Sequence, residues 1–151
     1  NMKIEAVKKL SKYAKIFITS EKGMPNELKK YQIKIPAEKM HDALYFSSMY
    51  FGDGGTMTSE SAVLGVPSVF ISSSTTGYLD EEEKEGLIFR YTGYGDTQEK
   101  ALNKAIELIQ TKNLKKQWGL KKKAFLKGKI DGTELTVSFI EEHYEKYIKK
   151  G

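Results

Sequence analysis

Residues 51–67, FGDGGTMTSESAVLGVP, run from a short apolar segment through a glycine pair into a helix and on toward a further strand. Glycine lets the backbone turn sharply and lets a ligand approach it closely. A helix that begins at Thr56 directs free N–H groups and the positive end of its dipole toward this turn, and both favour an anion. The stretch therefore predicts a strand–turn–helix unit, with a candidate diphosphate cradle at Gly54, Gly55 and Thr56. A tight turn that serves packing alone explains the glycine pair at least equally well.

Short apolar runs alternate with helical patterns on both sides of this unit. Strands are expected at 15–20, 32–35, 49–53, 67–71 and 87–91, and helices at 4–14, 26–30, 36–47, 56–65, 79–85, 96–109, 114–126 and 134–150. Regular alternation of short apolar strands with helices is typical of a mainly parallel sheet that is covered on both faces. We therefore expect one Rossmann-like, three-layer α/β domain over residues 1–151, with a helical C-terminal tail at 112–150.

Charge is unevenly distributed along the chain, whose formal net charge is +5. Residues 1–40 carry a net charge of +6, residues 41–110 a net charge of −7 and residues 111–151 a net charge of +6. Lysine supplies 24 of the 25 basic residues, whereas nucleic-acid readers usually rely on arginine for bidentate contacts. A basic module that binds nucleic acid or an anionic membrane surface is therefore a minor alternative, supported by the terminal lysines alone.

Several classes of site are disfavoured by composition. The absence of cysteine excludes disulfides, thiolate metal sites and a cysteine nucleophile. The two histidines, His41 and His143, lie far apart in the sequence, so we expect no histidine-rich metal site. No apolar run approaches the roughly 18 residues of a membrane-spanning helix. We also expect no secretory leader, and we expect the protein to be cytoplasmic.

Further candidate ligand contacts lie near the glycine turn. Thr56 and Ser59 add hydroxyl groups to the first turns of the helix. Glu60 is suited to accept hydrogen bonds from a ribose diol, although a carboxylate near a helix start is equally explained by the helix dipole. The polar loop Ser72–Gly77 follows a strand end and is able to wrap a ligand. His41 is a candidate for phosphate binding or acid–base catalysis, although a surface position is more common for such a residue.

Two charged features lie farther along the chain. The acidic run Glu81–Glu85 is expected to form a solvated helix face, because consecutive helix positions point in different directions. Arg90 is the single arginine of the chain and follows an expected strand. A contact to phosphate and a salt bridge to the acidic run are equally good interpretations of this residue.

Several segments together carry a family resemblance: IPAEKMH at 35–41, GGTM at 54–57, SE at 59–60, AVLGVP at 62–67, GYLD at 77–80 and KID at 129–131. They resemble the GT-B-like family catalogued as domain of unknown function 354. Residues 53–67 are also similar to the C-terminal domain of UDP-N-acetylglucosamine 2-epimerases, which have an Asp-Ser-Gly-Gly turn followed by Glu and Leu-Gly-x-Pro. The glycosyltransferase that makes lipid II has a related turn and a glutamate at the matching helix position. The resemblance covers nearly the whole chain.

The resemblance implies a role for individual residues. In the better-known relatives, the turn contacts the diphosphate, the helix glutamate contacts the ribose, and the preceding strand end and helix start hold the uracil. These roles carry over to Gly54, Gly55 and Thr56 for the diphosphate, to Glu60 for the ribose, and to Ile35, Pro36 and Met40 for the uracil. The serine of the epimerase turn is Gly54 here, so a side-chain contact to phosphate is lost unless Thr56 replaces it.

A complete GT-B protein has two Rossmann-like domains with the active site between them, and this chain corresponds to the C-terminal one. The resemblance therefore implies the UDP-sugar-binding half of a glycosyltransferase or of a UDP-sugar 2-epimerase-like enzyme. It also implies an N-terminal partner domain outside this chain, no turnover by the chain alone, and no need for a metal or a cofactor. A degenerate GT-B domain that acts as a protein-interaction module is the alternative, and the replacement of the turn serine by Gly54 favours it.

Overall fold

A three-stranded parallel sheet stands at the centre of the computed structural model, which describes residues 2–20, 23–74, 76–91 and 95–147. Its strands are β1 Tyr50–Gly52, β2 Ser68–Ile71 and β3 Ile88–Tyr91, paired in this order. In the register, Phe51 lies beside Val69, and Val69 lies beside Phe89. All four residues of β2 are buried, as expected for the middle strand of a sheet that is covered on both faces.

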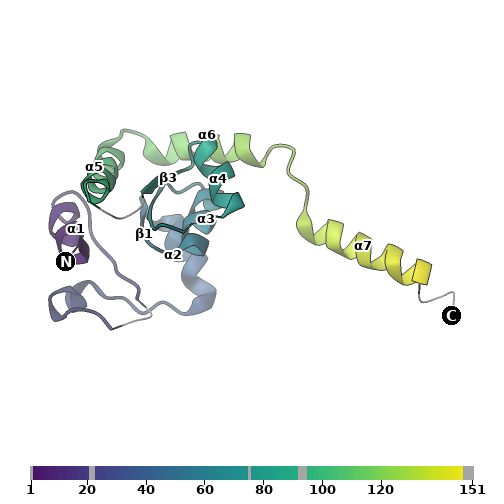
Figure 1. Cartoon of the computed structure of the whole chain (residues 1–151), viewed down its shortest axis with the longest axis horizontal. Helices are drawn as coiled ribbons and strands as arrows, with labels where there is room; N and C mark the ends of the chain where they lie inside the picture. Colours follow the sequence, from purple (N-terminus) through teal and green to yellow (C-terminus); the bar gives the residue numbers. More distant parts are fainter. Residues whose placement is uncertain (1, 21–22, 75, 92–94, 148–151) are drawn as a thin grey trace.

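Helices cover both faces of the sheet (Figure 1). Their bounds are α1 Met2–Leu10, α2 Met40–Phe46, α3 Gly55–Leu64, α4 Gly77–Lys84, α5 Thr97–Gln110, α6 Leu114–Leu126 and α7 Gly132–Tyr147, with short 3₁₀ helices η1 Asn26–Tyr31 and η2 Ala37–Lys39. Helix α5 packs on β2 and β3 and carries α1, whereas α3 packs on β1 and β2, with α2 and α4 beside it. The predicted mixed α/β domain of Rossmann-like layout is confirmed.

The core lies between β2 and the helices on its two sides. On α5, Ala101, Leu102 and Ala105 are buried and face the sheet, which follows the helical spacing of apolar residues in the sequence. On the other face, Ala62 of α3 and Leu79 of α4 are buried in the same cluster. Because only Asp53 and Gly54 connect β1 to α3, the first turn of α3 lies close to the carboxyl end of β1, where the candidate site is expected.

Trp118 of helix α6 forms a hydrogen bond with the residue that precedes β3. The indole Nε1–H of Trp118 donates a hydrogen bond of 2.8 Å to the carbonyl oxygen of Leu87, and both residues are buried. The ammonium group of Lys121, one turn farther, lies 4.1 Å from the centre of the Trp118 ring and donates to the Gly86 carbonyl over 2.8 Å. These contacts close the end of the sheet at which β3 begins.

Two of the five predicted strands are wrong. The segments 15–20 and 32–35 contain no strand, and a single parallel bridge joins Ile18 to Gln32. Ile18 N–H donates to the Tyr31 carbonyl over 2.9 Å, and Ile33 N–H donates to the Ile18 carbonyl over 3.0 Å. The local sequence favours strands here, but a strand also needs a partner along its length, and each segment pairs at one residue.

Some helix boundaries also differ from the prediction. The helix expected from Pro36 begins as the 3₁₀ turn η2 and becomes α-helical at Met40. The first helix ends at Leu10 rather than continuing to Ala14. The helices α3, α5 and α6 lie within one residue of the expected bounds, and the predicted residues 148–150 of the last helix lie outside the described part of the chain.

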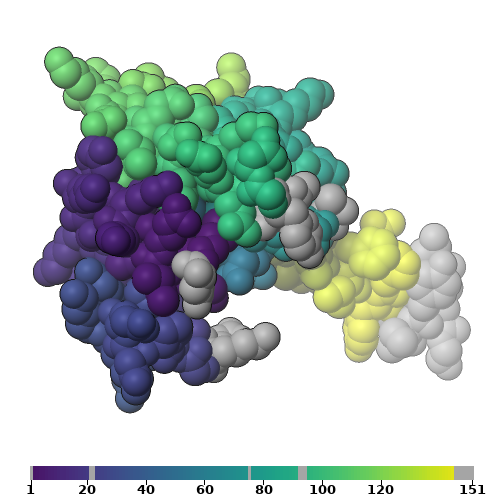
Figure 2. Space-filling model, turned by 60° about the vertical axis from the view of Figure 1, so that its left-hand side comes forward, coloured from purple at the N-terminus to yellow at the C-terminus, as the bar shows by residue number. Residues whose placement is uncertain are grey.

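Helix α7 extends away from the rest of the molecule (Figures 1 and 2). Every residue from Gly132 to Tyr144 is exposed, including Leu135, Phe139 and Ile140 at 55%, 58% and 59%. Among the described residues, no helix has the length and apolar character that crossing a membrane requires.

Replacing Trp118 by phenylalanine removes the donor to the buried Leu87 carbonyl. We expect the Trp118→Phe variant to lose about 1–3 kcal/mol of unfolding free energy, since an unpaired buried carbonyl loses its hydration without compensation. Urea denaturation followed by far-UV circular dichroism measures this change, because Trp118 is the single tryptophan and its fluorescence is lost in the variant. Leu120→Ala, at a 61% exposed position of the same helix, serves as the control and is expected to change stability by less than about 0.5 kcal/mol. Equal effects of the two changes would contradict the anchoring role of Trp118.

Candidate functional site

Two helices begin at the carboxyl edge of the sheet. Strand β1 ends at Gly52 and α3 begins at Gly55, whereas β2 ends at Ile71 and α4 begins at Gly77. Because β1 and β2 are parallel, both helix starts lie at the same edge, which is where open parallel sheets bind their ligands. A Cβ atom on Gly55 would lie 3.5 Å from the hydroxyl oxygen of Tyr78, so the first turns of the two helices are in contact.

The turn between β1 and α3 is partly occupied by a side chain of the protein. Gly54 N–H donates to the hydroxyl oxygen of Tyr50 over 3.3 Å, and the Gly54 carbonyl accepts from the Thr58 hydroxyl over 2.8 Å. A Cβ atom on Gly52 would lie 2.5 Å from the Tyr50 hydroxyl oxygen, so a larger residue at this position would displace the tyrosine ring. Burial raises the pKa of Tyr50, with a further increase from Asp53 and an opposing effect of the Gly54 hydrogen bond. The hydroxyl group therefore keeps its proton at neutral pH.

Three backbone amides remain available at the start of α3. The N–H groups of Gly55, Thr56 and Met57 precede the first intrahelical bond, which Thr58 N–H makes to the Gly54 carbonyl over 3.0 Å. Within the described part of the chain, these three amides have no hydrogen-bond acceptor, and Gly54 supplies no capping side chain. Together with the helix dipole, they are suited to bind an anion.

Glu60 lies beside His41, so the structure brings two predicted site residues together. The Nε2 atom of His41 lies 3.4 Å from Oε1 of Glu60, because α2 packs against α3. The Glu60 side chain is 32% exposed and that of His41 is 67% exposed. A ligand is therefore able to reach both groups.

Ser59 does not present a free hydroxyl group to the turn. Its Oγ–H donates a short hydrogen bond to Oε1 of Glu82 on α4. Glu82 is 3% exposed, its Oε2 atom has no hydrogen-bond partner in the described structure, and burial raises its pKa. The expectation of a solvated acidic face is thus wrong for Glu82, whereas Glu81 and Glu85 are exposed.

Arg90 is held by the acidic helix α4. Its Nη2 atom lies 2.6 Å from Oδ1 of Asp80, and its Nε atom lies 2.8 Å from Oε2 of Glu83. Oε1 of Glu83 also accepts the Arg90 backbone N–H over 3.1 Å. Of the two interpretations of Arg90, the salt bridge to the acidic run is the one that the structure contains. The ion pairs join the end of β3 to α4.

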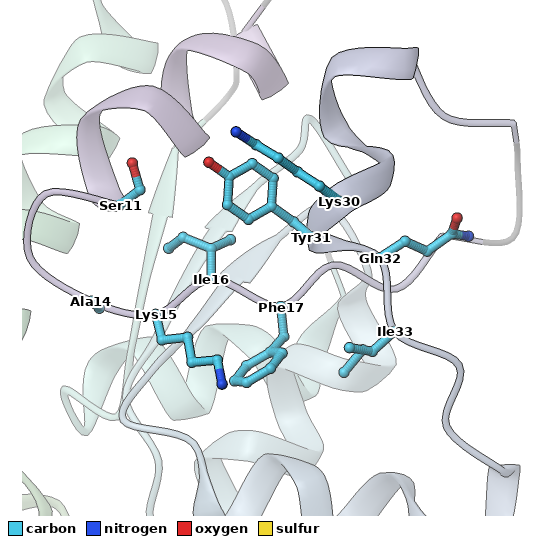
Figure 3. Close-up of a pocket in the computed structure, with 9 residues that line it drawn as sticks. All are labelled: Ser11, Ala14, Lys15, Ile16, Phe17, Lys30, Tyr31, Gln32 and Ile33. Atoms are coloured by element: carbon cyan, nitrogen blue, oxygen red, sulfur yellow. The ribbon is translucent and has the colours of Figure 1, made fainter.

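The residues predicted to hold a base lie just before α2. Ile35 and Met40 are half-buried and Pro36 is exposed, with η2 between them. A surface cavity of about 520 Å³ lies at a different place. It is lined by the segments 11–17 and 30–33, with the side chains of Ile16, Tyr31 and Lys30 around it (Figure 3). None of the predicted site residues lines this cavity.

The sequence does not predict Tyr50 and Glu82 as site residues, although their side chains form hydrogen bonds with Gly54 and Ser59 of the candidate site. Neither has a periodic signal in the sequence, because each depends on a contact between separate elements. Comparison of the chain with known protein families, with characterised proteins and with solved structures gives no significant match.

The buried carboxyl group of Glu82 predicts a pH-dependent stability. Its pKa is raised in the folded state, so the folded chain binds this proton more tightly than the unfolded chain does. Below the ordinary glutamate pKa, Glu82 is protonated in both states and its contribution to the unfolding free energy is fully present. This contribution is lost as the pH rises through the folded-state pKa. Glutamine has no carboxyl group to ionise, so Glu82→Gln removes that loss. We expect the unfolding free energy of the variant, relative to that of the parent, to increase as the pH rises from about 4 to 8. The increase should be about 1.4 kcal/mol per unit of pKa elevation.

Urea denaturation at a series of pH values measures this difference. Glu85→Gln is the matched control, because Glu85 is exposed on the same acidic segment. The difference between the control and the parent should stay constant with pH. A constant difference for Glu82→Gln as well would show that the Glu82 carboxyl group is not buried in the folded chain.

Proposed function

We propose that the chain is the nucleotide-sugar-binding half of a GT-B-type glycosyltransferase or UDP-sugar 2-epimerase-like enzyme, related to the family of domain of unknown function 354. The start of α3 supports this best, because three amides without an acceptor in the described structure lie at the ligand-binding edge of a parallel sheet. The ligand group that we assign to Gly55, Thr56 and Met57 is a diphosphate.

Two hydroxyl groups complete this anion site in the proposal. The side chain of Thr56 is exposed at the helix start and takes the place of the serine in the epimerase turn. The Tyr50 hydroxyl accepts a hydrogen bond from Gly54 and keeps its own proton, which is then available for a phosphate oxygen. In this arrangement Gly54 acts through Tyr50 rather than through direct contact with the ligand.

The nucleoside would extend from the diphosphate toward α2. Glu60, held by His41, accepts hydrogen bonds from the ribose hydroxyl groups. Uracil lies against Ile35, Pro36 and Met40, which precede and begin α2. The sugar and the second phosphate lie toward Gly77 at the start of α4. His41 is also the candidate for an acid–base role, since it is the single histidine of this region.

The chain alone is proposed to bind the nucleotide without turnover. In the GT-B resemblance the acceptor site and the catalytic base belong to the other Rossmann-like domain, and neither a metal nor a cofactor is needed. Helix α7 supports a contact with such a domain, because its apolar side chains Leu135, Phe139 and Ile140 are exposed. A buried interface with a second domain would remove these side chains from water.

A protein-interaction module is the second candidate. Two observations favour it: the Gly54 N–H is engaged by Tyr50, and the Ser59 hydroxyl is engaged by Glu82. A basic nucleic-acid or membrane-surface binder has less support, because Lys115 and Lys121 of the terminal segment donate to the carbonyl groups of Tyr45 and Gly86. Such lysines contribute less to an anionic surface than free ones do.

Titration of UDP and UDP-N-acetylglucosamine into the chain by calorimetry tests the proposed function. We expect both ligands to bind. We expect Glu60→Ala to raise the dissociation constant by about tenfold or more, since hydrogen bonds to charged groups contribute about 1.5–3 kcal/mol. Glu99→Ala, which removes an exposed carboxylate from α5, is the control and should leave binding unchanged.

The same titrations separate the alternatives. Salt-sensitive binding of a short oligonucleotide, together with no detectable binding of UDP, would overturn the proposal in favour of a nucleic-acid binder. Silence toward every nucleotide and oligonucleotide would overturn it in favour of the interaction module.

A further inference from the structure

The described structure contains two separate sets of parallel strand pairing. One is the sheet β1–β2–β3, and the other is the bridge between Ile18 and Gln32. In the part of the chain that the structure describes, no bridge joins the segment 15–19 to β1. Both sets border the same core, because Ile16 on one side and Met49 and Phe51 on the other pack against the buried cluster.

The outer edge of β1 has unused hydrogen-bonding groups. Tyr50 N–H donates to the Pro67 carbonyl over 2.9 Å, which directs the main chain of Tyr50 toward β2. Because successive residues of a strand alternate, the N–H and C=O of Phe51 point the other way. Neither has a hydrogen-bond partner among the described residues. Strand β1 also lacks the proline or charged side chain that usually protects an exposed edge.

The segment 15–19 has an edge of the same kind. Ile18 uses both its N–H and its C=O to bond with the segment 31–33, so the main-chain groups of Phe17 and Thr19 point away from that segment. These groups also lack a hydrogen-bond partner in the described structure. Ile16 and Phe17 leave the backbone on opposite sides, as in a strand, and Phe17 is 56% exposed (Figure 3).

The order of the elements along the chain indicates which strand position lies between the two edges. Doubly wound sheets have the strand order 3-2-1-4-5-6. The bridge between Ile18 and Gln32 occupies the position of the pairing between strands 2 and 3, and β1–β2–β3 matches strands 4, 5 and 6. The position between the two edges is then that of strand 1. Helix α1, which precedes 15–19 and packs against α5, stands where the helix that follows strand 1 belongs.

We propose that the sheet is completed by one further parallel strand, joined to the N-terminal end of α1 and inserted between β1 and the segment 15–19. This strand would be the centre of a sheet covered on both faces, so it requires a run of about five β-branched or aliphatic residues. Acidic residues fit at its ends, because residues 1–40 carry a net charge of +6. The proposal does not depend on nucleotide binding.

A second copy of the chain does not fit this position. A position bounded by two edges accepts a single strand, whereas the edge of another folded sheet would pair with β1 alone. Symmetric pairing of two chains would also bring together two segments that each carry the net charge of +6. The completing strand is therefore assigned to the polypeptide segment before α1.

Hydrogen exchange on the 151-residue chain tests the two edges. We expect the amides of Phe17 and Phe51 to exchange at least about tenfold faster than those of Ile18 and Tyr50, whose N–H groups are bonded to carbonyl oxygens. Equal protection of all four amides would overturn the proposal, since the two edges would then be paired with each other or with a second chain.

A library of N-terminal extensions tests the completing strand itself. Each member carries eight randomised residues and a four-residue Gly/Ser/Asn linker before the chain, and survivors of protease digestion are sequenced. We expect survivors to be enriched in proline-free runs of Val, Ile and Leu. In the isolated survivors, the amides of Phe17 and Phe51 should exchange about tenfold or more slowly than in the parent chain.

The matched control is the same library on the Phe17→Pro chain. Proline removes an N–H that faces the proposed strand, and the parent chain makes no hydrogen bond with it among the described residues. Circular dichroism verifies that the control chain folds. We expect the enrichment to be lost in the control. No enrichment in the parent library, or equal enrichment in both libraries, would overturn the proposal, whatever the outcome of the UDP titrations.

Discussion

The parallel pairing of β1 with β2 is the constraint on which the candidate site depends. It brings the carboxyl ends of two strands to one edge, and the helices α3 and α4 therefore begin side by side, with Tyr78 against Gly55. Arg90 strengthens this arrangement, because its ion pairs with Asp80 and Glu83 fix α4 to the next strand. An antiparallel pairing of the same strands would place the two helix starts at opposite edges of the sheet and would leave no common anion site.

Internal hydrogen bonds compete with a ligand at this edge. The Tyr50–Gly54 and Ser59–Glu82 bonds use groups that a nucleotide would otherwise contact. A neutral hydrogen bond contributes about 1 kcal/mol net, whereas a bond to an ionised phosphate oxygen is roughly twice as strong. The Tyr50 hydroxyl accepts from Gly54 and still has its own proton to donate, so this bond is able to persist when a phosphate binds. Redirecting Ser59 would leave the buried carboxyl group of Glu82 without its partner, so Ser59 is better explained as part of the α3–α4 contact.

The sequence was sufficient for elements whose pattern is local. The buried face of α5 follows from helical spacing, and the β2 strand follows from its continuous apolar run. The bounds of α6 match the helix expected at 114–126. The strands at 15–20 and 32–35 were overestimated, because their length depends on neighbouring strands rather than on propensity. The roles of Glu82 and Tyr50 are not predicted for a similar reason. The packing of separate elements decides which member of an acidic run is buried. It also decides which tyrosine ring turns back over a glycine.

Charge determines what kind of anion site this edge is able to form. No lysine or arginine occurs between Lys39 and Lys84, and residues 41–110 carry a net charge of −7. Lys3 of α1 lies 4.0 Å from Asp53 beside the turn and is already paired with that carboxylate. The other donors at this edge are the neutral N–H groups of α3 and nearby hydroxyl groups, within a segment whose net charge is negative. Such donors act at contact distance, so their effect depends weakly on ionic strength, whereas a site built from lysines loses affinity steeply as salt is added. Under the proposed function, the ribose contact with Glu60 and the base contact at the start of α2 would therefore have to supply part of the affinity that the diphosphate does not.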